Sequence, residues 1–137
     1  MDDFSNCMVS NSRMAARAIT RRYDAYVRPF GITATQLSLM GAIQMIPGAT
    51  VSELAEKRGF ERTTLTRNLD RLEEMGLVAS ARPQRGNARI AQITTKGEAL
   101  LEQLLPLWRQ AQAELRDTLS TKTFDDSIKT LKRLAKV

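Results

Sequence analysis

The sequence predicts a mainly α-helical fold that carries one small β-hairpin. Apolar residues recur at helical spacing through most of the 137 residues, and Pro or Gly interrupts this spacing at several expected helix ends. Only residues 77–93 depart from the pattern, with two short strand-like runs on either side of a turn that contains Pro, Gly and Asn. We therefore expect helices before and after a single hairpin.

The first two predicted helices have clear starts and ends. One covers residues 10–28, follows a start over residues 1–6 that we expect to be frayed, and ends at Pro29. The other opens on Thr33-Ala-Thr-Gln36, a capping box in which two side chains satisfy free helix N–H groups. The next Pro-Gly pair ends it.

The next two predicted helices have the spacing of a helix-turn-helix over residues 51–75. A second capping box, Thr50-Val-Ser-Glu53, opens the first of them. Counting from residue 51, a small residue falls at the fifth position, Ala55, where the second helix crosses closely. Gly59 falls at the ninth, where the turn needs a residue that tolerates positive φ.

A hairpin and two helices are predicted to complete the chain. The strands cover residues 77–81 and 89–93. A long helix begins at Thr94 and contains Pro106, which should kink it. A last helix begins at about Phe124. The hairpin makes the motif a winged helix-turn-helix.

The outer side of the fourth helix carries residue types that suit DNA recognition. Arg pairs with guanine, Asn with adenine, and Thr contacts phosphate or the thymine methyl. The candidates lie at the N-terminal end, which contacts bases in helix-turn-helix proteins. They are Arg62, Thr63, Thr64, Thr66, Arg67 and Asn68. The acidic residues that follow, Asp70, Glu73 and Glu74, would be repelled by phosphate; an ordinary solvated helix face is the alternative interpretation.

The basic charge of the chain is concentrated in the hairpin. The net charge is +6, and no Asp or Glu occurs from residue 75 through 97. The DNA-binding candidates in this wing are Arg82, Arg85 and Arg89, of which Arg85 is the first choice for the minor groove and Arg89 the second. The alternative is a basic turn that only keeps the loop soluble.

The composition argues against an enzyme, a metal site and a bound cofactor. His is absent, Cys7 is the only cysteine, and no glycine-rich phosphate loop, nucleophile motif or cluster of carboxylates is present. A lone cysteine, no secretory signal and no long apolar run indicate a reduced, cytoplasmic setting without a membrane partner.

Residues 50–101, TVSELAEKRGFERTTLTRNLDRLEEMGLVASARPQRGNARIAQITTKGEALL, resemble the core of the multiple-antibiotic-resistance regulator (MarR) family of transcription factors. The flanking helices are similar too, so the resemblance covers nearly the whole chain. It implies an obligate homodimer that binds a palindromic operator on double-stranded DNA. It also implies a repressor released by a small, often phenolic or anionic, ligand or by thiol oxidation.

The wing departs from the family pattern. Family wings carry an Asp-Arg-Arg-like stretch, which falls on residues 85–87 here, where Arg85 stands in place of the acid. The usual wing salt bridge is therefore not expected, and the Arg for the minor groove moves to Arg85 or Arg89.

The flanking helices carry more apolar residues than a winged helix alone can cover, so we expect them to pack against a second copy. We assign residues 1–30 and 95–137 to dimerisation and residues 31–97 to DNA binding, with the wing at 77–94, in a single compact chain. The dimerisation candidates are Trp108, Leu115, Leu119, Phe124, Ile128, Leu131 and Leu134.

Three alternatives stay open at this stage. Cys7 could sense oxidants, or it could be an inert apolar side chain. Arg13, Arg17 and Tyr23 could line a ligand pocket between the first helix and the winged helix, or they could serve dimer packing. The chain could also be an architectural protein that binds DNA without sequence preference.

Overall fold

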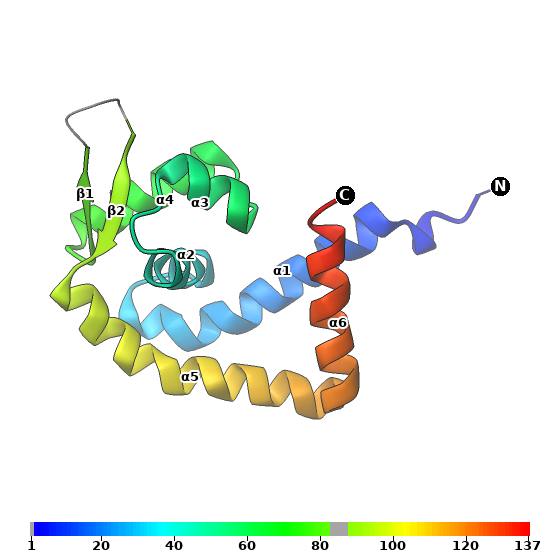
Figure 1. Ribbon diagram of the computed structural model, residues 1–137. Coiled ribbons are helices and arrows are strands. Elements are labelled where there is room, and N and C mark those ends of the chain that lie inside the picture. The colour runs from blue at the N-terminus through cyan, green and yellow to red at the C-terminus, as the bar shows by residue number, and fades with distance from the viewer. Residues whose placement is uncertain (1, 83–87) are drawn as a thin grey trace.

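The computed structural model describes residues 2–82 and 88–137, which form six α-helices and one two-stranded hairpin (Figure 1). The predicted fold class is confirmed. The helices and strands are α1 Met8–Val27, α2 Ala34–Met45, α3 Val51–Arg58, α4 Arg62–Glu74, β1 Val78–Ala81, β2 Ile90–Ile93, α5 Thr95–Leu119 and α6 Thr121–Leu134, with 3-10 turns η1 Phe4–Asn6 and η2 Arg28–Phe30.

The start of the chain is more ordered than the expectation of a frayed segment over residues 1–6. The carboxylate of Asp3 accepts hydrogen bonds from the backbone N–H and the hydroxyl of Ser5, at 2.9 and 2.8 Å, and so caps η1. The side chain of Asn11 donates to the carbonyls of Ser5 and Cys7, each at 2.8 Å. These contacts connect η1 to α1, which therefore begins two residues earlier than predicted.

One of the two predicted capping boxes forms completely. Thr33 accepts from the N–H of Gln36 at 3.1 Å, and the Gln36 side chain accepts from the N–H of Thr33 at 3.0 Å. At α3 only half of the box is present, because Thr50 accepts from the N–H of Glu53 at 3.1 Å. The Glu53 carboxylate accepts from the Thr50 hydroxyl at 3.2 Å and not from the Thr50 N–H. The start of α3 is held by the hairpin instead, because Thr50 pairs with Ile90.

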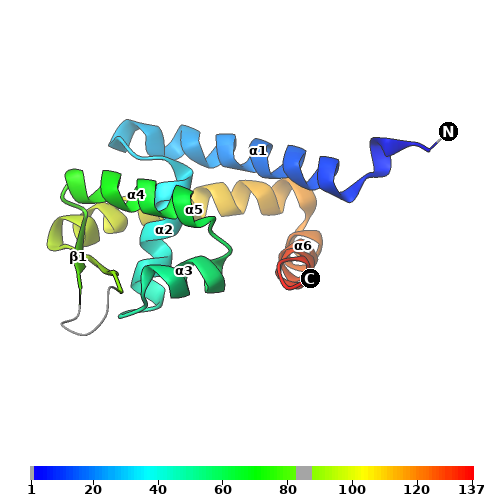
Figure 2. The ribbon, with the colours of Figure 1, turned by 90° about the horizontal axis from the view of Figure 1, so that it is seen from above.

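The core lies around α2, which packs between the helix-turn-helix and the long helices. Figure 1 shows α2 near the centre of the winged part, and Figure 2 shows α1 and α5 extending away from it side by side. The fully buried side chains include Leu39, Met40, Leu54, Leu65, Leu69, Leu72 and Leu104. Burying each contributes about 1.5–3 kcal/mol, so this core fixes the position of α4 relative to the long helices.

A close backbone contact joins the hairpin to α5. β1 and β2 pair antiparallel, with Val78 opposite Ile93. Directly after them, Gly97 in the first turn of α5 lies so close to the carbonyl of Leu77 that an added Cβ would be 2.2 Å from its oxygen. Only glycine permits this approach. The start of α5 is thereby packed directly against the base of the wing.

The far end of the molecule is a corner between α5 and α6. α5 is one continuous helix through Pro106, and α6 begins three residues before the predicted start. Ser120 turns the corner with φ 74° and caps α6 through the N–H of Thr123 at 3.3 Å. Figure 1 shows α6 standing across the end of α5, away from the winged part.

Candidate nucleic-acid interface

Glu61 caps the N-terminus of α4. Its carboxylate accepts from the N–H groups of Thr63 and Thr64, at 3.1 and 2.8 Å, and from the Thr64 hydroxyl at 2.7 Å. These hydrogen bonds, the Thr64 hydroxyl first, lower the pKa of Glu61 to about 2. Because Glu61 already occupies two of the free N–H groups at this end, we expect DNA contact here to come mainly from side chains. Sequence reasoning missed this cap because the preferred residues at the position are Ser, Thr, Asp and Asn.

Four of the predicted residues share the exposed face of α4: Arg62, Thr63, Thr66 and Arg67, which we call the recognition face. They line a shallow groove of about 410 Å³ together with Asp70. The opposite face of the helix is fully buried through Leu65, Leu69 and Leu72. The amphipathic pattern therefore presents two guanidinium groups and two hydroxyls to solvent at the N-terminal half of the helix.

Two other predicted residues do not lie on the recognition face. The hydroxyl of Thr64 donates to Glu61, and the amide of Asn68 donates to the carbonyl of Thr64 at 3.0 Å. The Asn68 oxygen accepts from Gln36 of α2 at 3.4 Å, and Gln36 is 8% exposed. In this structure both side chains are half-buried and hold the helix in place rather than facing outward.

Arg89 is placed differently from its predicted role at the wing tip. Its guanidinium forms ion pairs with Asp70 at 2.9 Å and Glu73 at 3.1 Å, and its Nε donates to the Ser80 hydroxyl at 2.9 Å. The side chain is only 14% exposed. We call Arg89, Asp70, Glu73 and Ser80 the Arg89 cluster. Two carboxylates of the recognition helix bind the Arg89 guanidinium in this structure, and its predicted minor-groove contact stays a prediction.

The Arg89 cluster changes the electrostatics of α4. The Ser80 hydroxyl and the Arg89 guanidinium lower the pKa of the Glu73 carboxyl, against the raising effect of its burial. Two of the three carboxylates that phosphate would repel, Asp70 and Glu73, are thus paired with Arg89. The Arg89 backbone also takes part, since its carbonyl accepts the N–H of Val51 at 2.8 Å. One residue therefore joins the wing, α3 and α4.

The remaining wing candidates lie at or beyond the end of β1. Arg82 directly follows β1 and is exposed. Arg85 lies outside the described residues. So do Gly86 and Asn87, the other two residues that differ from the family's wing pattern.

Comparison with known proteins agrees with this geometry. Residues 30–90 match the MarR family profile. The M. tuberculosis transcriptional regulator MosR is 36% identical, with 98% of each chain covered and a TM-score of 0.83. The chain belongs to the MarR family. It is a winged helix-turn-helix transcriptional regulator of this family and not an enzyme.

Other solved and curated relatives of this MarR-family chain bind DNA or regulate transcription. MosR in complex with DNA has a TM-score of 0.85. A mutant of E. coli MarR complexed with operator DNA is 25% identical, covers 98% of this chain and 99% of its own, and has a TM-score of 0.83. The uncharacterized HTH-type transcriptional regulator YwoH of Bacillus subtilis is 25% identical over 80% of this chain and 83% of its own length.

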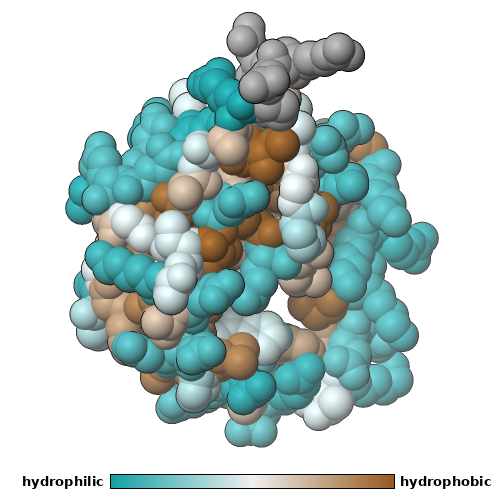
Figure 3. Space-filling model, turned by 60° about the vertical axis from the view of Figure 1, so that its left-hand side comes forward, coloured by the Kyte–Doolittle hydropathy of each residue, from teal (hydrophilic) through white to brown (hydrophobic). Residues whose placement is uncertain are grey.

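The long helices of this MarR-family chain expose most of the predicted dimerisation residues. Trp108, Leu119, Ile128 and Leu131 are between 38% and 53% exposed, and Leu115 and Leu134 are half-buried. Figure 3 shows a face with a hollow that is partly bordered by apolar side chains. Phe124 is the exception, because it is only 6% exposed and the Arg116 guanidinium lies 4.3 Å from its ring centroid. Phe124 is therefore covered within its own chain, and its predicted part in the dimer stays a prediction.

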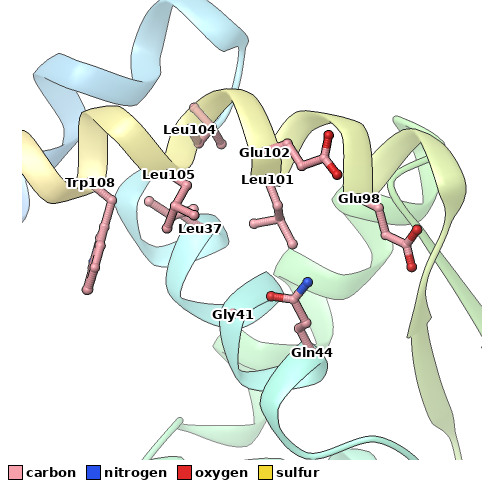
Figure 4. A pocket seen from close by; sticks show the side chains of 9 residues that line it. All are labelled: Leu37, Gly41, Gln44, Glu98, Leu101, Glu102, Leu104, Leu105 and Trp108. Atoms are coloured by element: carbon pink, nitrogen blue, oxygen red, sulfur yellow. The ribbon is translucent and has the colours of Figure 1, made fainter.

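The predicted ligand-pocket residues do not come together. Arg13 and Arg17 are exposed on the N-terminal half of α1. The hydroxyl of Tyr23 donates to Gln112 of α5, and burial raises the pKa of this phenol. None of the three lines the groove between α2 and α5, which measures about 290 Å³ (Figure 4). The expected pocket between α1 and the winged part stays a prediction.

Two further findings bear on the earlier expectations. Cys7 is the N-cap of α1, and the backbone N–H groups of Ser10 and Val9 lower the pKa of its thiol. Across residues 2–82 and 88–137, no helix combines the length and the apolar character that crossing a membrane requires.

Proposed function

We propose that the chain is a homodimeric repressor that binds a palindromic operator in the cytoplasm and is released from it by a small ligand. The observation that carries the DNA-binding part is the recognition face, exposed on a helix whose other side is fully buried. In helix-turn-helix proteins this end of the second helix enters the major groove. A rigid and basic face of this kind suits direct contact with base edges.

The roles within the recognition face follow from its chemistry. Arg62 and Arg67 supply guanidinium groups that can pair bidentately with guanine, and Thr63 and Thr66 can contact phosphate or the thymine methyl. Arg82 and Arg85 are the proposed contacts to the adjacent minor groove, since Arg89 is held by α4. Thr64 and Asn68 support the helix by contacting its cap and α2.

Dimerisation is supported by the apolar side chains that the long helices leave exposed. Trp108 and Leu119 of α5 and Ile128 and Leu131 of α6 are the proposed contacts. A second copy would cover them and would supply a second recognition face. The two faces must lie about 34 Å apart to read half-sites one DNA turn apart.

Electrophoretic mobility shift with the gene's own promoter region tests the proposal. We expect saturable binding that is stronger than to random DNA of equal length. With about eight phosphate contacts, the log–log dependence of affinity on salt should have a slope near −7. Equal affinity for random DNA would contradict the proposal and favour the architectural alternative.

Thiol sensing by Cys7 is a second candidate, favoured by one observation. Two backbone N–H groups at the start of α1 lower the pKa of the thiol, so a larger fraction is thiolate at neutral pH than in an ordinary cysteine. We expect peroxide to weaken operator binding of the wild type but not of Cys7→Ser. A full peroxide response of Cys7→Ser would contradict this role.

A further inference from the structure

Side chains from the start of α5 bind the C-terminal end of α4. The ammonium of Lys96 donates to the carbonyl oxygen of Met75 at 2.7 Å. The hydroxyl of Thr94 donates to the carbonyl oxygen of Gly76, also at 2.7 Å. The last carbonyls of an α-helix have no partner inside the helix. Residues that lie 18 and 21 positions farther along the chain therefore supply partners at the end of the recognition helix.

The backbone turn after α4 leaves these two carbonyls for α5. Gly76 has a positive φ of 73°, and its N–H donates to the carbonyl of Glu73 at 2.9 Å. The N–H of Leu77 donates to the carbonyl of Leu72 at 3.0 Å. These two bonds form a Schellman motif, which satisfies carbonyls within the last turn of the helix. The carbonyls of Met75 and Gly76 follow that turn, and their side-chain partners come from α5.

The charge of Lys96 suits this position. The C-terminus of an α-helix carries a partial negative charge, which favours a cation beside it. Among residues 2–82 and 88–137, Lys96 forms no ion pair, and its ammonium is bound to the Met75 carbonyl. The stem of the side chain lies over Gly76, since a Cβ added to that glycine would be 3.7 Å from the Lys96 Cδ. Lys96 thus contacts the end of α4 with both its charge and its stem.

The end of α4 that Lys96 binds is remote from the recognition face. Arg67 and Met75 are eight residues apart along the chain, a rise of about 12 Å. At that distance, a rotation of α4 by about 5° moves the position of Arg67 by about 1 Å. A binding side chain has to be held within about 0.5 Å of its productive geometry. A small rotation of the helix is therefore enough to weaken a bidentate contact to a base.

We propose that Lys96 is a positioning residue for DNA recognition, because its hydrogen bond to Met75 fixes the angle at which Arg67 and the rest of the recognition face meet the operator. Thr94 assists by donating to Gly76. Lys96 acts through α4 and not by contact with a base. The inference rests on the proposed function and deepens it, since the preference for the operator over random DNA is then set partly at the end of α4 that is remote from the bases.

Removal of the charge at Lys96 tests this role through the preference for operator over random DNA. Lys96→Met keeps the stem and loses the ammonium. We expect it to weaken operator binding about fivefold and to leave binding to random DNA of equal length nearly unchanged, because random DNA is bound through its phosphates. Lys96→Arg should keep the preference, since a guanidinium also donates to a carbonyl. Lys129→Met, which removes one exposed charge from α6, is the control and should keep it too.

A double-mutant cycle with Arg67 tests whether Lys96 acts through the recognition face. In the Arg67→Ala background the contact that Lys96 positions is already lost. Lys96→Met should then weaken operator binding only about twofold, because mutations at two coupled positions are not additive. The same loss in both backgrounds would overturn the inference.

Two other roles for Lys96 give different results, and either result would overturn the inference. A direct phosphate contact would make Lys96→Met weaken operator and random DNA equally and would reduce the salt slope by about 0.9. A purely structural role would lower the thermal unfolding temperature of Lys96→Met without changing its preference, measured well below that temperature. If Lys96→Met does not fold, Lys96→Gln takes its place in both measurements. A wild type without preference for its operator contradicts the proposed function itself, whereas a preference that Lys96→Met retains contradicts only this inference.

Discussion

Charged side chains along α4 and beside it set the charge that this helix offers to DNA. Glu61 is fixed at the N-terminus by the N–H groups it accepts from, and Arg89 neutralises Asp70 and Glu73 on the C-terminal half. Arg67 lies between these two ends and has no such partner within the described residues, so its guanidinium is available to a base. Among residues 2–82 and 88–137, the carboxylates of this helix cap it or form ion pairs, whereas Arg62 and Arg67 of the recognition face form no ion pair.

Replacing Arg67 by alanine tests that division. We expect Arg67→Ala to lower operator affinity by about 1–3 kcal/mol and to relax the preference at one operator position, because a bidentate contact to a base is lost. Arg71→Ala is the matched control, since Arg71 forms an exposed ion pair with Glu74 on the same helix. Mobility shifts with single-position operator variants measure both effects. A uniform loss across all sequences would reassign Arg67 to phosphate.

Glu61 gives a pH-dependent prediction for stability. Its pKa in the folded chain is about 2, below the ordinary value of 4.5, so its cap stabilises the folded state above pH 4.5 and loses that effect as pH falls toward 2. Glu61→Gln lacks this contribution. Urea midpoints measured from pH 2 to 7 should therefore differ most between wild type and variant above pH 4.5 and converge near pH 2. A constant difference across this range would contradict the assignment.

At the scale of helices and strands, the sequence predicted the order of elements but not the contacts that orient them. Periodicity and capping residues located the helices because both are local properties. The Arg89 cluster escaped detection, since its residues are up to 19 positions apart and only the folded hairpin brings them together. The neighbours of Asn68 escaped detection for a related reason: a polar residue near the edge of a helical stripe faces solvent or a neighbour depending on what packs there, and here Gln36 does. Its predicted contact with a base stays a prediction.

The Arg89 cluster should matter for stability and for DNA binding together. Arg89→Gln would leave Asp70 and Glu73 unpaired beside the DNA, so we expect a loss of about 1–2 kcal/mol in stability and weaker operator binding. Arg89→Lys should keep only part of the stability and operator affinity of the wild type, because one ammonium cannot reach all three partners. Denaturant unfolding and mobility shift measure the two effects. Arg71→Gln, which removes only an exposed ion pair, is the control and should cost less than about 1 kcal/mol.

At the scale of the whole molecule, α5 and α6 leave apolar side chains exposed, and the proposed dimer would cover them. Trp108, Leu119, Ile128 and Leu131 were identified as apolar residues in excess of what one winged helix covers, and they are exposed. Phe124 has the same pattern but is buried at the corner under Arg116, a contact that depends on the conformation of Ser120.

A single substitution in α6 tests the proposed dimer. Leu131 is 53% exposed, so Leu131→Asp should leave the chain folded while placing a charge in the proposed interface. We expect sedimentation to show a single chain of 15.3 kDa instead of twice that mass, with weaker operator binding. Lys129→Asp, two residues away on the exposed surface of the same helix, should remain dimeric. A wild type that is monomeric while bound to its operator would contradict the dimer.

The contact between Gly97 and Leu77 has a mechanical consequence. With no side chain between them, the base of the wing and the first turn of α5 cannot rotate independently, so we expect them to move as one lever. A change in angle between the long helices of two copies would then be transmitted as a swing of each complete winged part. Over the length of α5, a few degrees at the far corner would alter the separation of the two recognition helices by ångströms, enough to lose the register of a palindrome.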